Sequence, residues 1–240
     1  MKTYLPHRTW LAISGPDAER FLQGQLTCDM REVNAGLSPL AAHCSPQGRV
    51  ISLFRLIKHG NTYYLNLPLD MKEIAEKNFR KYIPFFKASL NDVSDTLQAV
   101  GVDAAEYATL DTQGLTIAKV DDTRYIIIGD ALSDVTHNET AWHAQDIQAG
   151  LPMVYAATSE KFLPHYLNLP VLGGVSFQKG CYTGQEIIAR MQYQGKLKYA
   201  LQQKILHHAA SVGEKLSTGE TVVDGILHHD QWQTLVIGGI

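Results

Sequence analysis

Residues 40–67 read LAAHCSPQGRVISLFRLIKHGNTYYLNL, and this stretch decides the fold. Segments 40–44, 50–57 and 62–67 are rich in apolar and β-branched residues and have the length of strands. Turn residues around Pro46 separate the first two segments, and Gly60 lies between the last two. Two short turns between three strands predict a three-stranded antiparallel meander.

The segments on either side of the meander predict further elements. Residues 9–14 alternate as a strand, and a helix with one apolar face follows from about Asp17. After the meander, Asp70 and Glu73 form a capping pair for a helix that ends near Tyr82. We therefore expect helices to cover one face of the sheet.

The middle of the chain repeats this mixture of strands and helices. Short β-prone runs at 97–102, 115–120 and 124–128 precede a helix at 139–148. Strands grouped with covering helices, without strict βαβ alternation, predict an α+β fold and disfavour a doubly wound nucleotide-binding fold. The sequence also has no GxGxxG and no P-loop.

The last part of the chain has a different pattern. Glycine-punctuated strand signals at 198–206, 214–216 and 234–237 predict a small β module. We therefore divide the chain into a main α+β region, 1–197, and a short C-terminal β module, 198–240. The module is too short to bury a core of its own, so we expect it to lean on the main region.

Composition places the protein among ordinary globular chains. The 240 residues are 45% hydrophobic and 19% charged, with a net charge of -3. No segment has the roughly 18 consecutive apolar residues of a membrane span, and the first residues lack the apolar core of a signal peptide. These features predict a cytoplasmic protein with no membrane partner.

Basic residues are concentrated in one segment of the chain. Residues 179–204 hold five basic residues and one acid, Glu186, so this segment would favour an anionic ligand.

The ten histidines show neither HExxH nor a Cys/His pair at zinc spacing. We expect no metal site.

The most informative run for chemistry is 173–190, GGVSFQKGCYTGQEIIAR. Thr183 and Glu186 have the spacing of a capping box, which predicts a helix start near Thr183. Cys181 would then lie just before a helix N-terminus and close to Lys179, and both features favour a thiolate. Cys181 is therefore a candidate nucleophilic or redox-active thiol. The alternative is a structural cysteine in a glycine-rich turn, which is the role we expect for Cys28 and Cys44.

The octamer KGCYTGQE at 179–186 resembles the K-x-C-Y-x-G-Q-E signature of the YgfZ family, folate-binding proteins related to the aminomethyltransferase (T-protein) of the glycine cleavage system. The resemblance extends from about residue 11 to residue 198. Blocks at 17–29, 42–44 with 48–49, 146–152, and 162–164 with 168–169 resemble family blocks in the same order.

The resemblance implies a T-protein-like fold, with ferredoxin-like α+β units around a central folate pocket and a short C-terminal β-barrel-like module. It implies tetrahydrofolate or a derivative as the ligand, and a role in the maturation or repair of iron–sulfur proteins, whose assembly machinery or clients would be partners. Bacterial members are also linked to tRNA thiolation. In this interpretation Cys181 is the key thiol with Lys179 beside it. The expected cofactor-binding residues are Tyr182, Gly184, Gln185, Glu186, Arg190 and Lys196.

Two alternatives remain open at this stage. A folate-dependent aminomethyltransferase would need a carboxylate in the meander, but the matching run 47–53, QGRVISL, has none. A tRNA-binding or tRNA-modification-associated protein would use the basic 179–204 segment. The overall acidic balance and the lack of a recognised RNA module disfavour direct binding.

Overall fold

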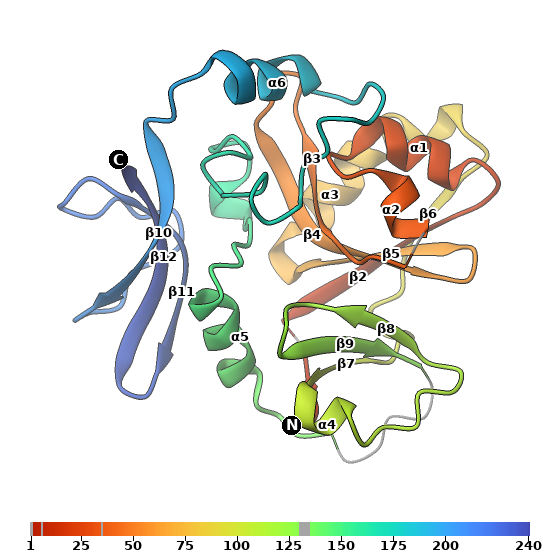
Figure 1. Ribbon diagram of the computed structural model, residues 1–240, viewed down its shortest axis with the longest axis horizontal. Helices are drawn as coiled ribbons and strands as arrows, with labels where there is room; N and C mark the ends of the chain where they lie inside the picture. The colour runs from red at the N-terminus through yellow and green to blue at the C-terminus, as the bar shows by residue number, and fades with distance from the viewer. Residues whose placement is uncertain (1, 6, 35, 130–134) are drawn as a thin grey trace.

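The computed structural model describes residues 2–5, 7–34, 36–129 and 135–240. Within these residues the chain forms three antiparallel sheets (Figure 1). The α+β class is therefore confirmed. The largest sheet has the order β3-β4-β5-β2-β6, with β2 at Arg8–Ser14, β3 at Leu40–Cys44, β4 at Val50–His59, β5 at Thr62–Pro68 and β6 at Ser89–Asp92.

The predicted meander is confirmed, because β3 pairs with β4 and β4 pairs with β5, both antiparallel. Three helices supply apolar side chains to the core on this sheet: α1 (Ala18–Gln25), α2 (Met30–Asn34) and α3 (Lys72–Phe79). Phe21 of α1 and Phe79 of α3 meet there at a ring-centroid distance of 6.0 Å. Single 3-10 turns at Leu69–Met71 and Ile83–Phe85 flank α3.

The predicted capping role of Asp70 is wrong. No side chain caps α3, and the Oδ2 atom of Asp70 instead accepts a hydrogen bond from the amide of Ala156, 2.9 Å away. The reason is that a 3-10 turn ending at Met71 precedes α3, which separates Asp70 from the start of the helix. Asp70 therefore ties the main sheet to the segment after α5.

The second sheet has the order β1-β7-β9-β8, with β1 at Lys2–Tyr4, β7 at Ala99–Asp103, β8 at Thr116–Lys119 and β9 at Arg124–Ile128. The short helix α4 (Ala104–Tyr107) follows β7. Helix α5 occupies Glu139–Gln148, as the sequence predicts, and packs Trp142 against this sheet. Gly101 has to be glycine here, because a Cβ at this position would lie 2.6 Å from the Trp142 ring.

The third sheet, β10-β12-β11, contains β10 (Tyr199–Leu206), β11 (Thr221–His228) and β12 (Gln231–Gly239). These three strands form an open sheet, so the expected barrel-like closure is not found among the described residues. The predicted strand at 214–216 is also wrong, since only an isolated bridge joins Lys215 to Thr221. Strand β11 escaped prediction because a bulge between Val222 and Asp224 breaks its alternation.

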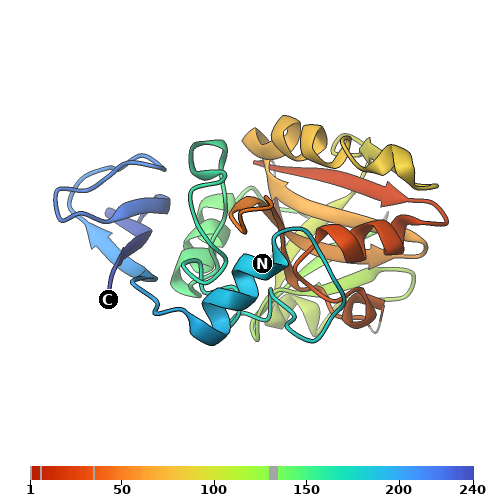
Figure 2. The same cartoon turned by 90° about the horizontal axis from the view of Figure 1, so that it is seen from above.

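The C-terminal sheet shares its core with the rest of the chain. Val223, Leu235 and Ile237 are buried in one cluster with Leu53 of β4 and Ile147 of α5. Helix α5 and the segment after it, which includes a 3-10 turn at Ala156–Thr158, lie between this sheet and the other two (Figure 2). The sheet thus leans on the main region, while the division at residue 197 stays a prediction.

Candidate functional site

The loop that contains Cys181 is anchored by Lys179, a residue with 6% of its surface exposed. Its ammonium donates three hydrogen bonds of 2.7 Å, to the backbone carbonyls of Gln23, Leu26 and Cys28. An ammonium has three donors. All of them are therefore used on the end of α1 and the turn after it, and none is left for the Cys181 thiolate or for a ligand carboxylate.

Lys179 keeps its charge in this position. Burial lowers its pKa to about 8, while the nearby Cys28 and Asp29 oppose that effect. The three carbonyls also favour the charged form. The ring of Tyr182 lies 4.9 Å from the ammonium and adds a cation–π contact. Burial raises the pKa of Tyr182 above its usual range, so this phenol is neutral.

Gly184 fixes the other end of the loop against the turn between β3 and β4. Its φ is 83°, and a Cβ would lie 2.5 Å from the carbonyl oxygen of Ser45 and 3.0 Å from the Cα of Gly48. Both the backbone conformation and the close approach therefore require glycine. Lys179 and Gly184 together hold Cys181 between two fixed points.

The predicted capping box is wrong. Helix α6 occupies Gln185–Gln194, and no side chain caps its N-terminus. The Thr183 amide donates to the carbonyl of Gly24, and Glu186 lies in the first turn, where it pairs with Arg190 at 3.3 Å. The left-handed Gly184 precedes the helix, so Thr183 does not occupy the cap position.

The three cysteines differ sharply in environment. Cys181 is exposed, whereas Cys28 and Cys44 are buried with 1% of their surface exposed. Burial raises the pKa of Cys28 to about 12, and it raises that of Cys44 further. The structural role predicted for Cys28 and Cys44 is consistent with this burial, and Cys181 is the one accessible thiol of the three.

The remaining predicted site residues spread outward from the loop. Gln185 is half-buried at the start of α6, and Arg190 and Lys196 are exposed on α6 and beyond it. None of the predicted residues lines the central pocket described next. Their role as folate ligands stays a prediction.

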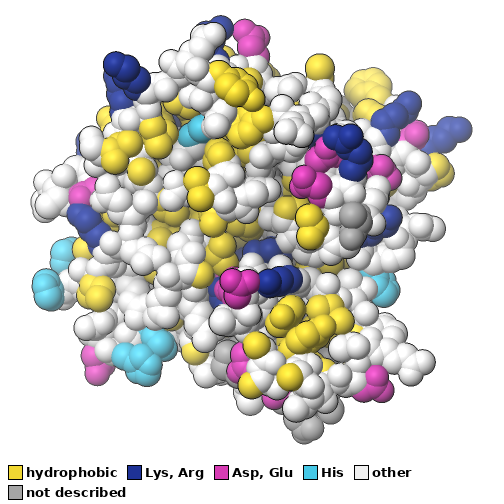
Figure 3. Space-filling view, in the orientation of Figure 1, with side chains coloured by type: hydrophobic (Ala, Val, Ile, Leu, Met, Phe, Trp, Pro, Cys, Tyr) yellow, Lys and Arg dark blue, Asp and Glu magenta, His cyan; other side chains and the backbone are white. Residues whose placement is uncertain are grey.

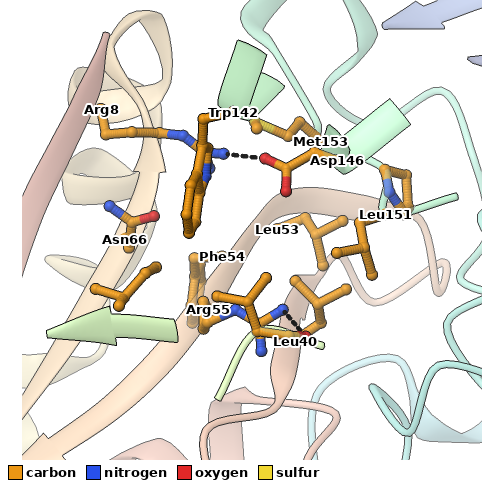
Figure 4. Close-up of a pocket in the computed structure, with 13 residues that line it drawn as sticks. Arg8, Leu40, Leu53, Phe54, Arg55, Asn66, Trp142, Asp146, Leu151 and Met153 are labelled. Carbon is orange, nitrogen blue, oxygen red and sulfur yellow. Dashed lines mark hydrogen bonds and ion pairs between the residues drawn. The ribbon is translucent and has the colours of Figure 1, made fainter. Parts of the chain in front are cut away.

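A pocket lies at the centre of the molecule, as the family resemblance implies, but the residues that line it differ from the predicted site residues. It lies between β4, β5, the β8-β9 side of the second sheet, α5 and the residues just after α5 (Figure 4). In the space-filling view, hydrophobic side chains form the recessed middle of this face (Figure 3). The labelled lining residues are Arg8, Leu40, Leu53, Phe54, Arg55, Asn66, Trp142, Asp146, Leu151 and Met153.

Buried charges surround this pocket. Asp146 pairs with Arg8 at 3.0 Å and with Arg124 at 2.8 Å, and all three side chains are at most 10% exposed. Arg55 donates to the backbone carbonyls of Ser38, Lys119 and Val120, and its burial lowers the pKa of the guanidinium to about 10. Arg55 therefore stays charged at neutral pH.

One polar atom at the pocket lacks a partner among the described residues. The Nδ2 amide of Asn66 is buried and makes no hydrogen bond. An unmade hydrogen bond at a buried amide costs about 1–3 kcal/mol. Asn66 lies in β5, where a polar residue interrupts an apolar strand, and Asp146 lies in the block 146–152 that resembles the family. Those were the available sequence signals for this pocket.

Other kinds of site are not found in the described part of the chain. No group of three or more His, Cys, Asp or Glu side chains there is placed to hold a metal ion. No described helix has the length and hydropathy to cross a membrane.

The arrangement of the three sheets has a counterpart among solved structures. The glycine cleavage system aminomethyltransferase T from Bartonella henselae has a similar structure, with a TM-score of 0.72 over 99% of this chain and 78% of that one, at 12% identity. The fold is therefore T-protein-like.

Sequence relatives are more specific, and the chain belongs to the YgfZ family. It is 33% identical over 218 residues to the tRNA-modifying protein YgfZ of Colwellia psychrerythraea, covering 80% of this chain and 67% of the relative. It is 35% identical over 217 residues to the protein of that name in Cronobacter sakazakii, covering 79% and 66%. The chain thus spans about two thirds of the length of these relatives. No family model matches it.

Proposed function

We propose that the protein binds a reduced folate in the central pocket and uses the thiol of Cys181 in the maturation or repair of iron–sulfur proteins. The observation behind the first half is the unpartnered Asn66 amide in a pocket with aromatic and aliphatic walls and buried arginines. The observation behind the second half is an exposed thiol that Lys179 and Gly184 hold in place.

The chemistry of the pocket residues fits a folate. Trp142, Phe54 and Leu53 offer faces for a flat pterin ring, and the Asn66 amide offers a donor to a ring nitrogen or carbonyl. Arg8 and Arg55 supply positive charge near the glutamate carboxylates of a folate tail. When bound, a reduced folate would itself carry a one-carbon group.

The free space in the pocket is small, about 30 Å³, which is room for about one water molecule. Pockets for ligands of folate size have roughly 300 Å³ or more. Binding therefore requires the wall formed by α5 and Met153 to move away from β4. That wall is held by the apolar packing of Trp142 and Ile147 and by the Arg8–Asp146 pair, so its movement costs packing as well as an ion pair.

Aminomethyl transfer is disfavoured by the same pocket. Its single lining carboxylate among the described residues is Asp146, and both oxygens of Asp146 are paired with arginines. Each oxygen of this carboxylate is therefore already occupied by a guanidinium group. The run 47–53, which matches the stretch that carries the carboxylate in the T-proteins, has no acid, and its Ser52 is fully buried.

The link to tRNA in this proposal is indirect. The relatives are named as tRNA-modifying proteins. A protein that maintains an iron–sulfur enzyme of tRNA thiolation would influence tRNA without binding it. The basic segment 179–204 offers fewer groups to a phosphate backbone than its sequence suggests, because Lys179 is buried and Lys204 is paired with Glu220.

The experiment is complementation of a strain that lacks its own YgfZ protein, with tRNA thiolation and the activity of an iron–sulfur enzyme as two readouts. Cys181→Ser should fail in both. Gly180→Ala is the matched control in the same loop, because a Cβ there meets nothing within 4 Å, and it should complement fully. Full complementation by Cys181→Ser would contradict the role of the thiol. Loss of thiolation with normal iron–sulfur activity would favour a direct role on tRNA.

A further inference from the structure

A second cavity, of about 360 Å³, lies against a different face of α5 from the central pocket. Trp142 and Asp146 line the central pocket, whereas Glu139 and His143 line the second cavity. At the start of β2, Arg8 lines the first and the preceding His7 lines the second. The two spaces are therefore neighbours with separate walls.

A hydrogen-bonded group of side chains orients His143 at this cavity. The Nε2 atom of His143 lies 2.8 Å from Oδ1 of Asp224, and the hydroxyl of Tyr155 donates to the same oxygen at 3.0 Å. Asp224 is fully buried. Because a carboxylate accepts, Nε2 carries a proton. Burial lowers the pKa of His143, but Asp224 outweighs burial and the pKa is raised above its ordinary value, so the ring favours the charged form in which both nitrogens are donors.

The backbone is built to place this group. Asp224 follows the bulge that interrupts the pairing of β11 with β12. A bulge redirects a side chain at the cost of a ladder hydrogen bond. The Oδ1 atom of Asp224 accepts from His143, Tyr155 and the amide of Gly225, whereas its Oδ2 atom has no hydrogen-bond partner among the described residues.

The remaining lining residues indicate the charge of a ligand. The carboxylates of Asp70 and Glu139 lie at the cavity, and no lysine or arginine is among the described residues that line it. His7 does not supply a positive charge, because burial lowers its pKa to about 4. Leu69 and Ile226 add apolar surface. The cavity is therefore acidic and apolar, with an oriented imidazole in its wall.

We propose that this cavity is a second ligand site that takes a small free amine with an apolar body. Its ammonium group binds the carboxylates of Asp70 and Glu139, and its apolar body lies against the His143 ring and the side chains of Leu69 and Ile226. Asp224 and Tyr155 are positioning residues, since they hold the imidazole without touching the ligand. The site does not involve folate or Cys181, so a test of this proposal is independent of a test of the proposed function.

The test is NMR of the full chain with ¹⁵N-labelled histidine, titrated with n-butylamine and, separately, with n-butyrate. We expect n-butylamine to shift the ring nitrogen signals of His143 in a saturable way and n-butyrate to leave them unchanged. Glu139→Gln should weaken n-butylamine about tenfold, which is the loss of one charge-assisted contact. Glu73→Gln, an exposed carboxylate on α3, is the matched control and should bind as the wild type does.

Three results would overturn the proposal. One is the absence of a saturable shift with n-butylamine. Another is tighter binding of n-butyrate, which would make the site an anion site. The third is equal affinity in Glu139→Gln and Glu73→Gln, which would place the amine elsewhere. Asp224→Asn gives a separate check, because it should change the His143 ring nitrogen signals and weaken n-butylamine while leaving tetrahydrofolate binding unchanged.

Discussion

The ammonium of Lys179 and the carbonyl oxygen of Leu26 lie 2.7 Å apart, although 153 positions separate them in the sequence. Two more carbonyls, of Gln23 and Cys28, complete the set of acceptors. The contact joins the turn after α1 to the loop that contains Cys181. Lys179 thus anchors this loop, and its ammonium group is fully occupied by backbone carbonyls.

Lys179→Met should destabilise the protein strongly. It would leave three carbonyls without their donor, and unpaired buried acceptors cost about 1–3 kcal/mol each, so we expect the free energy of unfolding to fall by about 3–5 kcal/mol. Denaturant unfolding measures this change. Lys196→Met, at an exposed position, should stay within about 0.5 kcal/mol of wild type. Equal stability of the two variants would refute the anchoring role.

Cys181 should be the thiol that reacts in the folded protein. It is exposed, whereas the pKa of buried Cys28 is raised to about 12 and that of Cys44 is raised further. At neutral pH we expect iodoacetamide to modify one thiol per native chain, and three after denaturation, as read by mass spectrometry. Cys181→Ser should abolish the native reaction. Native labelling of Cys28 or Cys44 at a similar rate would show that their burial is misassigned.

Gly184→Ala and Gly180→Ala should have opposite outcomes. At Gly184 the new Cβ would lie 2.5 Å from a backbone oxygen at a φ of 83°, so we expect a loss of more than about 2 kcal/mol in the free energy of unfolding. At Gly180 the Cβ meets nothing within 4 Å, so the melting temperature should hardly change. If both substitutions were tolerated equally, the close packing of Gly184 against the turn between β3 and β4 would be wrong.

His43 should make the fold sensitive to acid. Burial lowers its pKa from 6.5 to about 4, and its ring stacks on Phe79 at 4.5 Å. Between these two pH values the unfolded chain binds a proton that the folded chain does not. The free energy of unfolding should therefore fall as the pH falls, by about 1.4 kcal/mol per unit from this residue. Urea unfolding at several pH values measures how the free energy of unfolding changes with pH. In His43→Leu this change should be smaller by about 1.4 kcal/mol per pH unit, the contribution of one proton. An unchanged pH dependence would contradict a neutral His43.

The sequence predicted the elements that have regular patterns. The meander from Leu40 to Pro68 follows from alternation and turn residues, and α5 has the predicted bounds. These signals are local, so a single sequence contains them. The prediction failed at Asp70 and Thr183, where a capping pattern was present but the side chain is used differently or the cap position belongs to glycine.

The candidate site was only half predictable. The loop around Cys181 follows from a contiguous motif, but the central pocket joins Arg8, Asn66 and Asp146 from three distant segments. Which buried charges pair with one another depends on tertiary packing, and no spacing rule encodes it. Lys179 was expected to act on Cys181 because the two are close in sequence, yet its chain turns inward to the carbonyls after α1.

The most direct test of folate binding in the central pocket is the affinity of tetrahydrofolate for the wild type and Asn66→Leu, measured anaerobically by isothermal titration calorimetry. Leucine has nearly the shape of asparagine and removes an unpartnered buried amide, so the variant should be as stable as the wild type or more so. We predict saturable binding to the wild type, equal binding to Cys181→Ser, and binding weakened about tenfold or more in Asn66→Leu. Absence of binding to the wild type, or equal affinity in Asn66→Leu, would contradict the account.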